Sequence, residues 1–349
     1  MKIAIHHNPD SYSTLWIKYC QRNKIQYKIV DAYANDIFKQ ITDCDAFMWH
    51  FHQEDYKAML FAKQLIFSLK HIGIIVYPDI DTCFYFDDKL GQKYLFEAAN
   101  VPTAPTHIFY TRQNALDWIK RTQFPKVFKL STGASSANVR LVKNARQARR
   151  LVKKAFRFGF EQYARINGFK ERMIKYRNGN GSLLWLLKGF VRIFISTEFS
   201  RMHSNEIGYI YFQDFIPNNT FDTRVILIGN RAVAKKRINR PNDFRASGSG
   251  IWIFEKEQID IRCIEKAFEI NKKLKMQSAA FDFIYNQYGN PILTEVSYCC
   301  GIKYNKGNHK YWTDFFYGYW SDDLQWHKCE NVNICDWIIE DTIEKITKQ

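Results

Sequence analysis

Two carboxylates stand on otherwise apolar, strand-like stretches in the last third of the chain. Asp282 lies between two phenylalanines in AAFDFIYN (279–286), and Glu295 lies in PILTEVS (291–297). An ionised carboxylate among aromatic side chains is costly unless it is paired or bound to a metal. The turn residues between the stretches predict a hairpin that puts both acids on one face if the register matches, and Ser297 shares the face of Glu295. Asp282, Glu295 and Ser297 are therefore candidate ligands for magnesium, which prefers hard oxygen donors.

A run of small residues, STGASSAN (131–138), follows a strand-like segment that contains Lys129. Small residues let backbone amides approach phosphate oxygens closely, and a lysine supplies a cation that a triphosphate needs. Lys129 with the loop residues Gly133, Ser135 and Ser136 is thus a candidate phosphate site. Taken alone, this loop is better explained as an ordinary flexible turn.

Three arginines occur between the small-residue loop and the two carboxylates. Arg224, Arg237 and Arg245 carry the planar guanidinium that suits a transferring phosphoryl group and a developing acyl phosphate, so they are the candidate catalytic residues. Without the other motifs, Arg224 and Arg237 are explained equally well as solvated charges at strand edges.

Strand-like and helix-like segments alternate over residues 1–87, which predicts a small parallel α/β domain with its ligand face at the carboxyl ends of the strands. The strand-like segments are 2–7, 25–33, 45–51 and 71–80, and the helices are 11–23 and 56–71. His6, His7, His50 and His52 fall at or just beyond those strand ends, where a hydrogen-bonded structural histidine is more usual than a catalytic one.

The rest of the chain predicts two further lobes. A helix at 88–100 and a linker at 102–105 lead to strands 124–130 and 139–142, which flank the small-residue loop as a hairpin lid would. The other predicted strands are 208–216, 224–229, 231–238, 279–286 and 291–297, and the other predicted helices are 144–158, 257–275 and 335–348. Residues 160–205 show no clear pattern.

The net charge of +16 is concentrated in one stretch. Residues 140–201 hold 16 Lys or Arg and three acids, a net +13. A solvated basic face, a nucleic-acid surface and a membrane surface all remain open, although no nucleic-acid motif accompanies the charge. Residues 183–195, LLWLLKGFVRIFI, mix large apolar side chains with two cations, a pattern typical of an interfacial helix on anionic lipid.

The eight cysteines show no pairing pattern and no zinc spacing, which predicts reduced thiols in a cytoplasmic protein. The first residues read as a strand and not as a signal peptide, and no apolar run is long enough to span a membrane.

The ordered motifs resemble the ATP-grasp superfamily over roughly residues 85–301, and within it the ribosomal-protein glutamate ligases. The resemblance is carried by DKLGQKYLFEAANVPTAPT, KLSTGASSANV, FQDFIP, FDTRVILIGNRAVAKKR, DFRASGSG and DFIYNQYGNPILTEVS. In addition, NDFRASGSG and GYWSDDLQWH look like ATP-grasp proteins encoded in surface-polysaccharide gene clusters. Six motifs in the correct order make a stronger signal than any one of them.

The resemblance implies a role for each matching position. Lys89, Lys129, Arg245 and Ser247 would contact phosphates of ATP, the backbone of Asp214 and Phe215 would read adenine, and Asp222 would hold ribose. Asp282 and Glu295 would bridge two Mg²⁺ ions, for which Mn²⁺ could substitute. The family usually has Asn where Ser297 stands, a departure that bears on the second metal site. It usually has Glu where Asp214 stands, a minor change because the backbone does most of the reading.

The implied fold class is α/β, with a Rossmann-like domain at 1–87 before a two-lobe ATP-grasp fold. The small lobe would span 88–213 with a basic insertion at 140–205, and the large lobe 214–349. The implied activity is an ATP-dependent carboxylate–amine ligase that forms an acyl phosphate, with a uronic acid of a surface polysaccharide as one possible carboxylate. An ATP-grasp kinase and a non-catalytic membrane- or polyanion-binding protein are the alternatives. The implied location is the cytoplasm, with 140–201 as a contact to the inner membrane face or a lipid-linked glycan.

Overall fold

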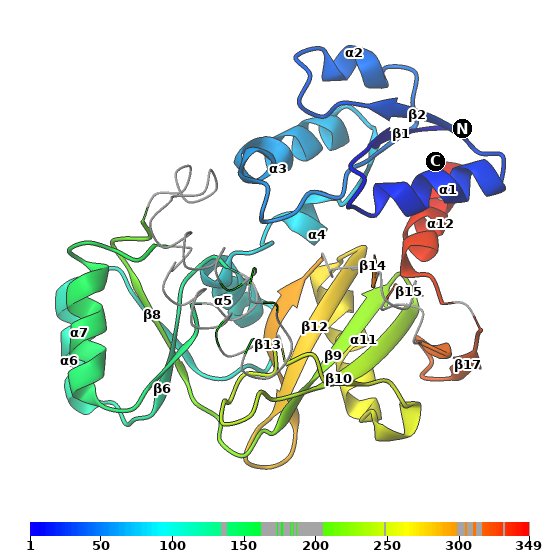
Figure 1. Ribbon diagram of the computed structural model, residues 1–349. Helices are drawn as coiled ribbons and strands as arrows, with labels where there is room; N and C mark the ends of the chain where they lie inside the picture. Colours follow the sequence, from blue (N-terminus) through cyan, green and yellow to red (C-terminus); the bar gives the residue numbers. More distant parts are fainter. Residues whose placement is uncertain are drawn as a thin grey trace.

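Figure 1 shows the computed structural model as an N-terminal domain beside two lobes. The structure describes residues 1–133, 138–161, 205–247, 249–298, 316–330 and 332–348, isolated positions between 173 and 186, and the short strands β14 (Tyr304–Asn305) and β15 (Lys310–Tyr311). Most of the predicted basic insertion, including nearly all of 183–195, lies outside the described residues.

The N-terminal domain is a four-stranded parallel sheet in the order β2-β1-β3-β4, which confirms the predicted parallel arrangement. Its strands are β1 (Lys2–His6), β2 (Gln26–Val30), β3 (Ala46–Met48) and β4 (Ile75–Tyr77), and its helices are α1 (Ser13–Arg22), α2 (Ile37–Ile41), α3 (Tyr56–His71) and α4 (Ile80–Cys83). Alternate residues of β1 face opposite ways. Ile3 and Ile5 therefore pack with α1, whereas Ala4 packs with α3.

The small lobe is an antiparallel sheet in the order β5-β8-β6-β7. Its strands are β5 (Thr106–Phe109), β6 (Lys126–Lys129), β7 (Arg140–Val142) and β8 (Ile210–Asp214), its covering helices are α6 (Arg112–Arg121) and α7 (Ala145–Ala155), and α5 (Lys89–Ala98) leads into it. The predicted hairpin around the small-residue loop is confirmed by the pairing of β6 with β7. Neither β5 nor α6 is predicted by the sequence pattern. Thr111 caps α6, and Ala115 and Trp118 bury one face of it.

The large lobe is a mostly antiparallel sheet in the order β13-β12-β9-β10-β16-β17, with β11 beside β10. Its strands are β9 (Phe221–Ile228), β10 (Arg231–Ile238), β11 (Trp252–Ile253), β12 (Ser278–Tyr285), β13 (Pro291–Ser297), β16 (Gly318–Ser321) and β17 (Trp326–Lys328). The helix predicted at 257–275 is α11 (Ile261–Leu274). It starts later because Asp260 caps it, while Lys256–Gln258 forms a separate 3-10 turn, η1.

The two faces of the large sheet have different partners. Val225 and Leu227 on β9 pack with α11, whereas Ile226 and Ile228 point the other way, into a core shared with α1 and the C-terminal helix α12 (Ile334–Thr347). The second face continues along β9 with Arg224 and Asp222, since residues two apart share a face. The apolar half of this face thus seats the N-terminal domain and leaves a charged half beside it.

None of the helices in the described ranges combines the length and the apolar character that a bilayer-spanning segment needs. Six cysteines in those ranges are free thiols, as predicted: Cys20, Cys44, Cys83, Cys263, Cys329 and Cys335. Cys299 and Cys300 lie outside them.

Candidate active site

A cleft of about 380 Å³ opens between the two lobes, and a loop of the N-terminal domain closes one side of it. Every predicted site residue that the structure describes lines this cleft: Lys89, Lys129, Gly133, Asp214, Phe215, Asp222, Arg224, Arg237, Arg245, Ser247, Asp282, Glu295 and Ser297. The loop residues Ser135 and Ser136 lie outside the described residues. Residues up to 208 positions apart in the chain (Lys89 and Ser297) are therefore brought to one place.

Lys129, the last residue of β6, is a half-buried cation that has no counter-ion among the described residues. Within the described parts of the chain its amine forms no hydrogen bond and no ion pair, although it lines the cleft. Burial, with a smaller contribution from the nearby Lys89, lowers the pKa of Lys129 to about 8 in spite of the opposing attraction of Glu295. An anionic ligand in the cleft would therefore stabilise the charged form of this amine.

Lys89 joins the two lobes through its side chain. Asp88 caps α5 by accepting from Gly91 N at 3.0 Å, and this places Lys89 in the first turn. Lys89 Nζ donates to Gly133 O at 3.0 Å and lies 3.3 Å from Glu295 Oε1. Burial alone would lower its pKa, but the carboxylates of Glu295 and Asp87 raise the pKa of Lys89 above its ordinary value. Lys89 is thus a permanent cation between the loop and the hairpin.

The α5 helix is also fixed to the large lobe and to β6 by backbone contacts. Gln92 donates to Val296 O at 2.8 Å and accepts from Val296 N at 3.1 Å, so its amide pairs with β13 like a strand residue. On the other side, Lys89 N donates to Ser131 O at 2.9 Å.

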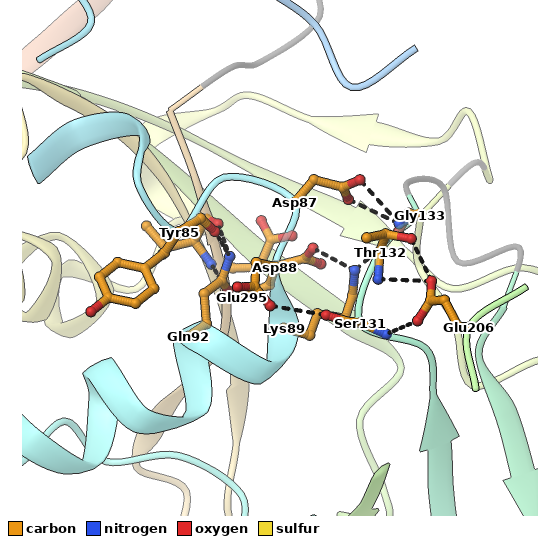
Figure 2. A network of polar contacts seen from close by, with 12 residues as sticks. Tyr85, Asp87, Asp88, Lys89, Gln92, Ser131, Thr132, Gly133, Glu206 and Glu295 are labelled. Atoms are coloured by element: carbon orange, nitrogen blue, oxygen red, sulfur yellow. Dashed lines mark hydrogen bonds and ion pairs between the residues drawn. The ribbon is translucent and has the colours of Figure 1, made fainter. Parts of the chain in front are cut away.

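Two carboxylates that the sequence analysis missed hold the amides of the small-residue loop (Figure 2). Ser131 N and Thr132 N donate to the two oxygens of Glu206 at 2.9 and 3.3 Å. Gly133 N donates to both oxygens of Asp87, at 3.0 and 3.2 Å. The loop can therefore present successive amides to oxygen anions, as a phosphate site requires. Glu206 escaped notice because it borders the unpatterned stretch, whereas Asp87 directly precedes the predicted helix.

Asp87 titrates abnormally because it is partly buried among other acids. Burial raises its pKa to about 6, Lys89 opposes the shift, and Glu295 and Glu206 add to it.

This shift predicts a pH dependence of stability. The folded chain keeps a proton on Asp87 that the unfolded chain releases near pH 3.8. The free energy of unfolding should therefore fall by up to about 3 kcal/mol between about pH 4 and about pH 6, with no further loss above that range. Urea unfolding of the wild type and of Asp87→Asn across this range measures the difference. Parallel curves for the two proteins would contradict the prediction.

Asp282 lies at the centre of a buried ion network on the large sheet. It pairs with Arg224 on β9 and with Glu295 on β13, so the predicted alignment of the two acids across the hairpin is confirmed. Arg224 Nε and Nη2 donate to Asp282 Oδ1 and Oδ2, both at 2.7 Å. Arg237 donates to Asp282 Oδ2 at 2.7 Å and to both oxygens of Asp222 at 2.6 Å. The two guanidinium groups outweigh burial and hold the pKa of Asp282 far below its usual range.

The acids retain capacity for a hard metal ion. Asp282 Oδ1 accepts one hydrogen bond and Oδ2 accepts two, while a carboxylate has about four acceptor sites. Glu295 lies beside it with one ion pair, to Lys89, and its side chain is 37% exposed. In the described ranges, no three His, Cys, Asp or Glu side chains are grouped so that they alone could hold a metal. The donor set therefore suits an ion such as Mg²⁺, which takes one or two carboxylates and completes its shell with phosphate oxygens and water.

Aromatic side chains also line the cleft. Phe215 lies edge-on to Phe244 with ring centroids 5.7 Å apart. Aliphatic side chains from several elements line the same cleft: Ala104, Val127, Val139, Ile216 and Ile284. Asp214 N donates to Pro105 O at 2.8 Å, so this N–H is not free to read a base. The Asp214 carbonyl and the backbone of Phe215 remain the candidates.

Polar side chains around Asp214 and Arg245 are held by further contacts. Lys126 Nζ donates to Asp214 Oδ1 at 2.6 Å, and the His107 ring lies 3.2 Å from the same oxygen. Arg245 turns toward Asp243, with Nη2 to Oδ2 at 2.6 Å, and Arg240 donates to Ser247 O at 2.8 Å. In this state Arg245 therefore binds a carboxylate of its own loop.

The N-terminal domain reaches the cleft through the loop after β3, where His52, Gln53 and Glu54 line it. Gln53 Oε1 is buried without a partner in the described parts of the structure. Of the four predicted histidines, only His52 lines the cleft. His50 instead stacks on Tyr12 with ring centroids 3.6 Å apart, and burial lowers its pKa to about 3, so it is a neutral structural residue.

No protein-family model matches the sequence, and no curated protein matches it. Solved structures do match the fold. D-alanine–D-alanine ligase from Bacillus anthracis superposes with a TM-score of 0.53 at 14% identity, over 100% of this chain and 99% of that one. The ATP-grasp ligase PsnB, solved with its minimal precursor, Mg and ADP, gives 0.53 at 11% identity, over 99% and 98%.

A third match covers a smaller share of the matched chain. Biotin carboxylase from Campylobacter jejuni, solved with an ATP analogue, gives a TM-score of 0.53 at 13% identity, over 87% of this chain and 66% of that one. At such identities the likeness is one of fold, and the chemistry has to be argued from the cleft itself.

Proposed function

The chain has the ATP-grasp fold, and from this premise we propose that it is an ATP-dependent ligase that joins a carboxylate to an amine. A single observation carries the proposal. One cleft combines a half-buried lysine, unpaired within the described residues, and a loop of amides on the small lobe with two adjacent carboxylates on the large lobe. Cations and amides suit a triphosphate, and the carboxylates suit its magnesium.

In the proposed arrangement the small lobe holds the nucleotide. Lys129 and Lys89 would bind phosphate oxygens, and the amides of residues 131–133 would do so once a phosphate displaces Glu206 and Asp87. The apolar residues near Phe215 would take adenine, and Asp222 would bind ribose. Asp282 and Glu295, with Ser297, would hold up to two magnesium ions, which neutralise charge as the phosphoryl group moves.

The reaction itself would proceed in two displacements. A substrate carboxylate oxygen attacks the γ-phosphorus of ATP, the bond to ADP breaks, and an acyl phosphate forms. An amine then attacks the acyl carbon, and inorganic phosphate leaves to give an amide. Arg224 and Arg237 would stabilise developing charge, since both guanidinium groups line the cleft.

For the substrates we propose a uronic acid or similar carboxylate of a surface polysaccharide, with ammonia or an amino acid as the amine. The support is the resemblance of NDFRASGSG and GYWSDDLQWH to proteins of polysaccharide gene clusters. The free thiols and the use of ATP support a cytoplasmic location.

Calorimetry with ATP and Mg²⁺ tests the nucleotide part of the proposal. We expect magnesium-dependent binding by the wild type and its loss in Asp282→Asn/Glu295→Gln. The matched control is Glu269→Gln, an exposed carboxylate on α11, which should bind like the wild type. Absence of binding by the wild type would overturn the proposal.

A screen of carboxylates and amines then tests the reaction. A ligase releases phosphate only when both substrates are present, in a one-to-one ratio with the amide. Transfer of phosphate to a hydroxyl without release would identify an ATP-grasp kinase instead. Nucleotide binding without turnover in an exhaustive screen would favour the non-catalytic alternative.

A further inference from the structure

A basic surface occupies the outer side of the small lobe. Residues 138–160 contain eight Lys or Arg and no Asp or Glu. In Figure 1, α7 lies with α6 at the edge of the small lobe that faces away from the sheet of the large lobe. This surface is therefore separate from the cleft.

The α7 helix has one buried stripe and one charged stripe. Ala148, Val152 and Ala155 are buried in the small-lobe core. Arg146, Arg150 and Lys153 repeat at i, i+4 and i+7, lie opposite the buried stripe and are exposed. Within the described parts of the chain, none of these three side chains forms an ion pair. The stripe thus offers a row of unpaired cations to a partner.

Two large apolar side chains stand at the end of this stripe. Phe158 is 61% exposed and Ile207 is 54% exposed. They are neighbours because Phe160 bridges to Glu206 and Asn205 Nδ2 donates to Phe158 O at 2.9 Å. The Arg157 guanidinium lies 4.6 Å from the centroid of the Phe158 ring. An apolar tip flanked by cations is costly to expose to water, and this favours a partner that is both anionic and apolar.

We propose that this surface, formed by α7 with Phe158 and Ile207, docks on an anionic lipid bilayer. The cations of α7 lie along the headgroups, and the two apolar side chains enter the boundary with the acyl chains. A nucleic acid would also attract the cations, but an aliphatic side chain such as Ile207 cannot stack on a base. A bilayer is the partner that uses both parts of the surface.

Vesicle flotation of the full-length chain tests the proposal. The vesicles are phosphatidylcholine alone or with roughly 30 mol% phosphatidylserine, the class of anionic lipid that attracts basic segments. We expect binding only to the anionic vesicles, and weaker binding as salt shortens the range of charge interactions.

Two variants separate charge from insertion. Arg146→Gln/Arg150→Gln/Lys153→Gln should weaken binding at least about tenfold because it removes three cations at the surface. Phe158→Ser/Ile207→Ser should also weaken it about tenfold, with the charge unchanged. The matched control is Lys18→Gln/Lys39→Gln/Lys272→Gln, which removes the same charge from exposed helical sites elsewhere and should change binding less than about twofold.

Equal thermal unfolding temperatures establish that the variants are folded, and the salt dependence of the wild type needs no variant. The proposal is overturned if the wild type does not bind anionic vesicles. It is also overturned if the triple α7 variant binds them as tightly as the triple lysine control does. It is also overturned if the apolar variant binds vesicles normally while a single-stranded oligonucleotide competes for the α7 cations. None of these outcomes depends on the ligase chemistry.

Discussion

Asp282→Asn is expected to lower the free energy of unfolding by about 3–5 kcal/mol, the range for breaking a buried ion pair from one side. The carboxylate accepts two hydrogen bonds from Arg224 and one from Arg237. Both guanidinium groups lie in the cleft wall and would keep their charge when the carboxylate is lost. Arg237 retains Asp222, so Arg224 bears most of the cost.

Urea unfolding measures this loss. Glu269→Gln, which removes an exposed partner of Lys266 at 3.5 Å, should change stability by less than about 0.5 kcal/mol. Adding Arg224→Met to Asp282→Asn should recover part of the loss, because the uncompensated cation is gone. If the Asp282→Asn variant were as stable as the wild type, the ion network around Asp282 would contribute little to the free energy of unfolding.

The same substitution should abolish magnesium-dependent turnover. Removal of one metal-binding carboxylate withdraws several kcal/mol of charge stabilisation, so we expect a fall of about 10³-fold or more in kcat/KM. This measurement is made well below the unfolding temperature of the variant, so that loss of fold and loss of chemistry are separated.

Lys129→Met is expected to stabilise the free protein while weakening nucleotide binding. Burial lowers the pKa of Lys129 to about 8 from 10.5, so keeping the charge at neutral pH costs the folded chain about 3 kcal/mol. Part of this should appear as a higher unfolding temperature in the variant. Loss of a charge-assisted contact to phosphate should weaken ATP binding about 10- to 100-fold.

The sign of the pH dependence gives an independent check. The unfolded chain holds the Lys129 proton up to about pH 10.5, whereas the folded chain releases it near pH 8, so the stability gap between variant and wild type should narrow as pH rises through that range. At pH 8 the wild type should also take up about half a proton per ATP bound, measured as a dependence of binding enthalpy on buffer.

Lys143→Met, which changes an exposed lysine of the same lobe outside the cleft, should alter neither affinity nor proton uptake. A Lys129→Met protein that binds ATP as tightly as the wild type would remove this residue from the phosphate site.

Local patterns in the sequence predicted most elements of the fold. The β12–β13 hairpin with the candidate metal ligands was predictable because Asp282 and Glu295 interrupt apolar strands. An ionised carboxylate among apolar side chains is costly unless it is paired or bound to a metal. The strand β5 was missed because it has four residues without apolar alternation, and the helix α6 was missed because polar residues outnumber apolar ones in it.

The candidate site was predictable as a set of residues but not as a set of contacts. Nothing local indicates that Asp282 would be shared by Arg224 and Arg237, because these three residues meet only through the pairing of β12 with β9 and of β9 with β10. Glu206 and Asp87 were missed for the same reason. Their role follows from where they meet the loop amides, far from their own neighbours in sequence.

The attachment of α5 determines how the cleft can open. Gln92 ties α5 to β13 with two hydrogen bonds, whereas Lys89 N is joined to Ser131 O by one, so we expect the helix and Lys89 to stay with the large lobe when the cleft opens. Rotation of the small lobe about the junction with α5 would then separate Lys89 from Gly133 and Asp87 from the loop, and leave Lys89 against Glu295. Opening of the cleft would therefore release the small-residue loop from Lys89 and Asp87 and leave the carboxylate hairpin paired with Lys89.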